Sequence, residues 1–179
     1  MNKLGRTNGF TLIELMVVIT VLGIVTALAV PSFSTLIENN RMSTMTNDLN
    51  STLQFARSEA VRRKGDVRVS AVDGDIGKGL RVWIDDGSGD FGDDDIELRV
   101  LSVNLGGLDL SVTVDDASKS NIDFSFNARG ERSLDGTLVL GLCDSRQGDY
   151  GRKLELLASG ALRLTKNITC NSGGGIPSV

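Results

Sequence analysis

The sequence contains no histidine, and its 179 residues include only two prolines, two cysteines and one tryptophan. Without histidine the chain cannot form a Ser-His-Asp or Cys-His catalytic arrangement, and it lacks the usual proton acceptor near neutral pH. Two cysteines alone also make a poor metal site. Paired carboxylates remain chemically open, but no phosphate-binding glycine loop or nucleotide fingerprint accompanies them. We therefore predict a protein that is not an enzyme and needs no cofactor.

Charge is almost absent from residues 10–30, where Glu14 is the single ionisable side chain. A helix of this length is roughly 30 Å long, which matches the hydrocarbon core of a membrane. Lys3 and Arg6 precede it, and positive charge holds that end in the cytoplasm, so the remaining chain should face the periplasm. A cleaved signal peptide is the alternative, with Ala27-Leu28-Ala29 as its cleavage site. The length of the apolar run and the cost of its carboxylate, about 2–3 kcal/mol near mid-membrane, favour a retained helix.

The stretch GFTLIE, residues 9–14, resembles the processing site of type IV pilins and of the pseudopilins of type II secretion. The resemblance implies that a prepilin peptidase cleaves between Gly9 and Phe10 and methylates the new amine of Phe10. Glu14 would then meet the amine of a neighbouring subunit, because either charge alone is expensive among apolar helices. Pro31 falls where such pilins commonly carry a proline, which fits a helix kink. The implied partners are other major and minor pilins, the peptidase and the inner-membrane assembly platform.

Apolar residues continue at helical spacing beyond Pro31 and predict a helix surface that packs on a globular domain. They are Phe33, Leu36, Ile37, Met42, Met45, Leu49, Leu53, Ala56 and Ala60. Gly65 after three basic residues predicts the helix end. We therefore divide the chain into a leader (1–9), a membrane and assembly helix (10–30), its amphipathic continuation (31–64) and a β domain (65–179).

Alternating apolar and polar residues separated by Gly, Asp and Asn predict an antiparallel β domain of about eight strands. The runs are residues 67–69, 80–84, 96–100, 110–114, 122–126, 138–142, 154–157 and 161–164. The pattern predicts an α+β fold, and the resemblance at residues 9–14 implies that this fold is type IV pilin-like, with the long N-terminal helix packed on the β domain. The order of elements, the FNARG turn at residues 126–130 and the GTLVLGLCDSR run from Gly136 resemble the FimU/FimT/GspH group of minor pilins and pseudopilins.

Cys143 and Cys170 both lie in the part that would be exported. Compartments beyond the cytoplasmic membrane permit disulfides, so this pair predicts one bridge between them.

The acidic stretch DDGSGDFGDDDIE, residues 85–97, is a calcium candidate. Counted from Asp86, oxygen ligands stand at calcium-loop spacing in Asp86, Ser88, Asp90, Asp94 and Glu97. The sixth place is phenylalanine where such loops carry glycine, and no helices are predicted beside it. A hairpin tip rich in Asp and Gly explains the composition equally well, so we assign no metal.

Nucleic acid is a further candidate partner, because FimT-type minor pilins are associated with DNA uptake through a Gly-Arg-x-Arg motif. The corresponding residues are Gly160-Ala161-Leu162-Arg163, so the first arginine is missing, and Arg163 and Lys166 are the remaining candidate contacts. Loss of Lys3 and Arg6 with the leader leaves 17 of 19 basic residues against 23 acidic ones. Phosphate contact requires several cations, so DNA binding is not favoured.

These observations together predict a minor pilin, a structural subunit that initiates or caps a type IV pilus. It would reside in the inner membrane by a single pass before it enters the fibre. A minor pseudopilin of type II secretion and a DNA-binding minor pilin that serves natural transformation are the alternatives.

Overall fold

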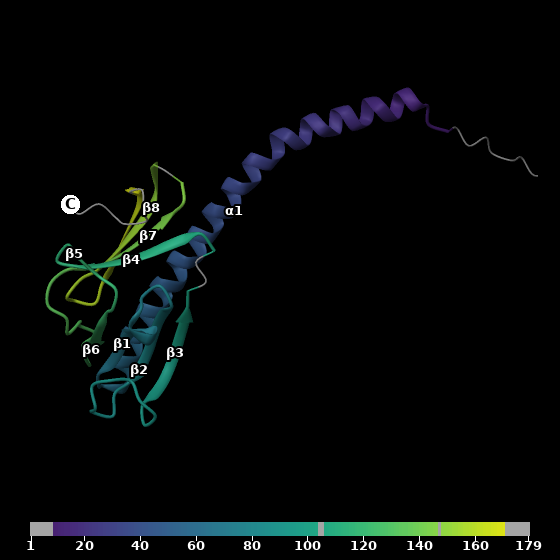
Figure 1. The fold of residues 1–179 in the computed structure, drawn as a ribbon. Coiled ribbons are helices and arrows are strands. Elements are labelled where there is room, and N and C mark those ends of the chain that lie inside the picture. Colours follow the sequence, from purple (N-terminus) through teal and green to yellow (C-terminus); the bar gives the residue numbers. More distant parts are fainter. Residues whose placement is uncertain (1–8, 104–105, 147, 171–179) are drawn as a thin grey trace, which may run out of the picture. The chain divides into compact units, whose positions relative to one another are not determined.

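The structure is a computed structural model that describes residues 9–103, 106–146 and 148–170. Residues 30–32 are described by their backbone only. Within these residues one long helix is followed by a 3-10 turn and nine strands (Figure 1). The elements are α1 (Leu12–Arg63), β1 (Val67–Ala71), η1 (Val72–Gly74), β2 (Gly79–Ile84), β3 (Ile96–Ser102), β4 (Leu108–Val114), β5 (Ala117–Lys119), β6 (Asp123–Phe126), β7 (Leu138–Asp144), β8 (Gly148–Leu156) and β9 (Leu162–Cys170).

The chain forms two compact units, residues 1–40 and residues 41–179. The predicted leader, apart from Gly9, lies outside the described residues. Helix α1 runs without interruption through Pro31. It ends one residue earlier than the Gly65 stop suggests, because Lys64 itself takes the left-handed conformation with φ of 56°. The Gly65 N–H then reaches back to the Ala60 carbonyl at 3.3 Å, which satisfies the last turn.

The strands of the second unit form two antiparallel sheets. One sheet has the order β3-β2-β1-β6 and the other has the order β5-β4-β7-β8-β9. The predicted α+β pilin-like architecture is confirmed. Eight of the strands correspond to the predicted runs, and the ninth is β5, a polar strand of three residues that the alternation does not reveal.

The core of the second unit lies between α1 and the two sheets. Its helical members are the predicted ones from Met42 to Ala60, spaced by three and four residues and all buried. Predicted members of the same stripe in the first unit behave differently, because Phe33, Leu36 and Ile37 are 65%, 52% and 44% exposed. These three residues belong to the first unit, so packing of the domain on them stays a prediction. Helical spacing shows an apolar face and not what covers it.

Candidate functional site

The predicted processing bond lies immediately before α1. Gly9 and Phe10 precede the helix, and Phe10 is 80% exposed. The Thr11 hydroxyl accepts the Glu14 N–H at 3.3 Å and so caps the first turn. The peptide bond between Gly9 and Phe10 is therefore outside the hydrogen-bonded helix and open to a peptidase. Its cleavage, and methylation of Phe10, stay predictions.

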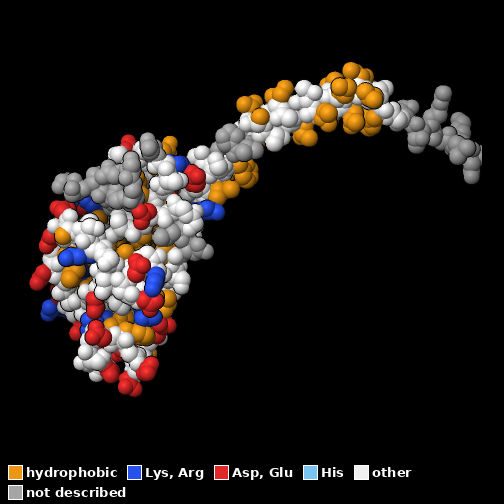
Figure 2. Space-filling view, in the orientation of Figure 1, with side chains coloured by type: hydrophobic (Ala, Val, Ile, Leu, Met, Phe, Trp, Pro, Cys, Tyr) orange, Lys and Arg blue, Asp and Glu red, His pale blue; other side chains and the backbone are white. Residues whose placement is uncertain are grey.

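Glu14 lies in the first turn of α1, where an acidic side chain favours the positive end of the helix dipole. The large apolar side chains that follow it as far as Leu28 are all more than half exposed, and Figure 2 shows them covering this part of the helix. An 18-residue window in α1 has a mean hydropathy of 2.6, so the helix is long and apolar enough to cross a membrane. An assembly role for Glu14 is compatible with this position and stays a prediction.

The predicted disulfide is confirmed. Cys143 in the central strand β7 is bonded to Cys170 at the end of the edge strand β9, across 27 residues of sequence. Gly151 makes the bridge sterically feasible, because a Cβ there would lie 2.5 Å from the Cys170 sulfur. The bond fixes the last residue of β9 to the middle of its sheet.

The acidic stretch forms the connection between β2 and β3, and its carboxylates group differently from the predicted calcium set. Asp85, Asp86 and Asp95 each place an oxygen within 4.8 Å of the others, and Asp86 is the member shared with the prediction. Of the other predicted ligands, Ser88 donates to the Asp90 carbonyl at 2.9 Å and Glu97 pairs with Arg81 at 3.0 Å. The sequence pattern missed Asp85 and Asp95, because their convergence depends on the backbone path of the loop.

Backbone N–H groups already donate hydrogen bonds to carboxylates of this cluster. Asp95 accepts the N–H groups of Asp86 at 2.9 Å and of Gly92 at 2.7 Å. Asp85 accepts those of Gly87 and Gly89 at 2.9 and 3.1 Å. These contacts fit a folded hairpin tip, and calcium binding stays an untested alternative.

Phe91, the residue that departs from the calcium pattern, anchors this loop on the outer face of the first sheet. Its ring meets that of Trp83 edge-on with centroids 5.5 Å apart, and the Arg81 guanidinium lies 3.9 Å from its centroid. Trp83 is 1% exposed although its side chain points away from the core, and its indole N–H donates to Ser70 at 3.0 Å. The aromatic contact therefore explains the phenylalanine.

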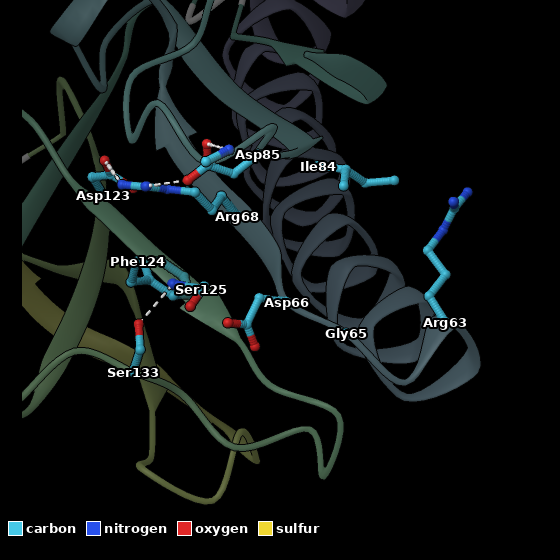
Figure 3. Close-up of a pocket in the computed structure, with 11 residues that line it drawn as sticks. Arg63, Gly65, Asp66, Arg68, Ile84, Asp85, Asp123, Phe124, Ser125 and Ser133 are labelled. Atoms are coloured by element: carbon cyan, nitrogen blue, oxygen red, sulfur yellow. Dashed lines mark hydrogen bonds and ion pairs between the residues drawn. The ribbon is translucent and has the colours of Figure 1, made fainter. Parts of the chain in front are cut away.

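A pocket of about 720 Å³ opens beside this loop, near the end of α1. Figure 3 shows Arg68 in its wall between two carboxylates, with Asp85 at 2.7 Å and Asp123 at 2.5 Å. The Arg68 guanidinium, with the N–H groups of Gly89 and Gly87, lowers the pKa of Asp85. Ser133 accepts the Ser125 N–H at 2.9 Å. These paired groups hold the loop, the sheet and the turn after β6 together.

The two candidate DNA contacts lie on β9 but project from opposite faces, because they are three positions apart along a strand whose side chains alternate. Arg163 is opposite Glu155 in register and pairs with it at 3.6 Å. Lys166 is opposite Arg152. The pair therefore does not present one continuous cationic surface.

Sequence reasoning missed Arg57, which connects α1 to two turns far along the chain. Its Nε donates to the Gly130 carbonyl at 3.0 Å, and an Nη donates to the Ser159 carbonyl at 3.2 Å. These acceptors are 73 and 102 residues away. The FNARG turn and the Gly160 turn thus form one contact site at the side of the helix. No periodicity in the sequence indicates such a contact.

Comparisons with known proteins agree with this architecture. Residues 45–160 match the family model described as type II transport protein GspH, and residues 4–30 match the prokaryotic N-terminal methylation motif. Two crystal structures of the type IV minor pilin FimU from Pseudomonas aeruginosa PAO1 are similar at 26% identity. One has a TM-score of 0.59 over 73% of this chain and 92% of FimU, and the other has 0.54 over 70% and 93%. No curated protein sequence matches. From the family match, which covers most of the β domain, the chain belongs to the GspH family of type II transport proteins.

Proposed function

We propose that this chain is a minor subunit that initiates or caps a type IV pilus, held in the inner membrane until it enters the fibre. The observation that carries the proposal is that α1 is a single helix whose first part is exposed and whose second part is packed under the sheets. The first part of α1 exposes apolar residues nearly all round, whereas the part from Met42 onward buries its apolar face under the sheets. An exposed apolar helix on a folded domain requires a membrane or a bundle of like helices.

The same feature supports the domain scheme that we propose. Residues 1–9 serve as the leader, residues 10–30 as the membrane and assembly helix, residues 31–64 as its continuation, and residues 65–179 as the periplasmic β domain. Glu14 sets the register by meeting the processed amine of a neighbouring pilin. The partners are other major and minor pilins, the prepilin peptidase and the assembly platform of the inner membrane.

A minor pseudopilin of type II secretion is the second candidate. The description of the matched family as a type II transport protein favours it, while the similarity to the minor pilin FimU favours the pilus. Both machines would use the same anchor, processing site and disulfide. The geometry of the subunit is thus common to both functions.

Two measurements test these proposals. Mass analysis of the mature protein should show an N-terminus at methylated Phe10, whereas a chain beginning at residue 30 would mean ordinary signal-peptide cleavage and refute the pilin assignment. Deletion of the gene should then reduce surface pili and leave secretion of type II substrates unchanged. The reverse pattern would assign the chain to the secretion machine.

A further inference from the structure

Strands β8 and β9 place two positive charges directly opposite each other. Arg152 of β8 is in register with Lys166 of β9, and the regular pairing continues through Leu154 and Leu164. Opposite side chains in an antiparallel pair lie on the same face about 5 Å apart, and like charges there repel. Leu154 is buried in the core, so the two cations lie on the face that carries α1.

The described part of the chain gives this pair no carboxylate. Arg152 donates to the neutral Ser43 hydroxyl of α1 at 2.8 Å, and desolvation lowers its pKa. The carboxylates on the same two strands are used elsewhere. Glu155 pairs with Lys153 at 2.9 Å, and Asp149 accepts the Thr169 hydroxyl at 2.6 Å.

An exposed apolar side chain lies beside these charges. Leu164, two residues before Lys166 on the same face of β9, is 41% exposed. β9 is also an edge strand, so no described strand covers its outer side. Figure 1 shows it as the yellow strand at the end of the described chain. Arginine is enriched at the centres of protein interfaces, and Leu164 adds exposed apolar area beside it.

We propose that Arg152, Lys166 and Leu164 form a docking surface for an acidic segment of a neighbouring subunit in the fibre. This inference rests on the proposed function, because it requires an assembled neighbour. A carboxylate from that neighbour would remove the repulsion between the two cations and satisfy the desolvated guanidinium, while an adjacent apolar side chain would cover Leu164. Two cations beside a leucine suit a protein carboxylate better than a nucleic-acid backbone, which needs a longer row of cations.

The test compares the full-length chain with its Lys166→Gln and Arg152→Gln variants in cells that make the fibre. We expect incorporation into sheared fibres, measured against the membrane fraction, to fall at least fivefold in both variants. The melting temperature of purified Lys166→Gln should stay the same or rise, because neutralisation removes a like-charge contact. Arg163→Gln is the matched control, since it neutralises a cation of the same strand that faces the other way and pairs with Glu155. Its incorporation should equal that of the wild type.

Three results would overturn the inference. Wild-type incorporation of both variants would show that no neighbour uses the cations. A loss of incorporation matched by a lower melting temperature in Lys166→Gln would indicate a structural role. Loss of DNA binding in a gel-shift assay, with incorporation intact, would assign the cations to nucleic acid. Absence of the wild-type chain from fibres would instead refute the proposed function.

Discussion

Replacement of Gly160 by alanine should destabilise the β domain strongly, because this glycine is restricted in two ways. Its φ of +73° is in the left-handed region, where an alanine costs roughly 1–2 kcal/mol. A Cβ would also lie 1.9 Å from the Gly130 carbonyl oxygen and 2.9 Å from Nε of Arg57. That oxygen accepts the Arg57 hydrogen bond, so the turn cannot move away without losing the contact.

Overpacking of this kind adds about 1–3 kcal/mol, so we expect Gly160→Ala to lower the free energy of unfolding by about 2–5 kcal/mol in total. Gly74→Ala is the matched control. Its φ of +72° is nearly the same, but the nearest atom to its Cβ would be Asn121 Nδ2 at 4.0 Å. It should therefore show the backbone cost alone, about 1–2 kcal/mol.

The single tryptophan provides the assay. Trp83 is 1% exposed in the second unit, so its fluorescence should report unfolding of the β domain in denaturant. Unfolding curves of the full-length wild type and of each full-length variant in detergent give the difference in the free energy of unfolding directly. Equal destabilisation by Gly160→Ala and Gly74→Ala would show that the Gly130 turn can yield, and would refute the rigid contact between the two turns.

Three further predictions concern the disulfide, the Glu59 ion pairs near the C-terminal end of α1, and Glu14. Serine at both Cys143 and Cys170 should lower the free energy of unfolding by about 3.5 kcal/mol in the chain-entropy account, measured by the same fluorescence, because the bridge closes a loop of 27 residues; an unchanged midpoint would contradict this. Hydrogen bonds from Arg62 and Arg63 lower the pKa of Glu59 to about 2, so the stability it contributes is complete above its ordinary pKa of 4.5 and is lost as the pH falls towards 2. Acid titration of helicity should show this loss in the wild type and less of it in Glu59→Gln, and identical curves would refute the pairing. Glu14→Ala should remain in the membrane with a normal domain but enter fibres poorly, and normal incorporation measured by immunoblot would exclude a registering role.

Hydrophobic periodicity predicted the elements that bury a face. The helix residues from Met42 to Ala60 and eight strands could be located because their apolar side chains recur with the period of the element. β5 could not be found this way, because its three residues are all exposed. A turn signal does exist in Asp115 and Asp116, which both adopt positive φ between β4 and β5, as Asp tolerates.

The residue spacing that suggested a calcium site was less informative than the hydrophobic periodicity that located helices and strands. A ligand spacing assumes a particular backbone path, whereas the periodicity does not. The spacing of the acidic stretch assumes a calcium loop, whereas Phe91 packs on Trp83 and directs the chain along another path. Asp85 and Asp95 then approach Asp86 from positions that the pattern does not include. The disulfide was predictable because it needed only two residues and a compartment, with no assumption about the path between them.

The geometry of Gly160 changes the meaning of the partial DNA motif. Its glycine closes a turn in which the Gly160 N–H donates to Leu157 at 2.8 Å, and the Gly130 turn has the equivalent bond to Asn127 at 2.8 Å. Both turns rest on Arg57, so a glycine is required at residue 160 whatever the protein binds. The glycine therefore carries no information about nucleic acid, and the motif reduces to the residues at 161 and 163. Residue 161 is alanine, and Arg163 pairs with Glu155 at 3.6 Å, so these two positions do not favour DNA capture.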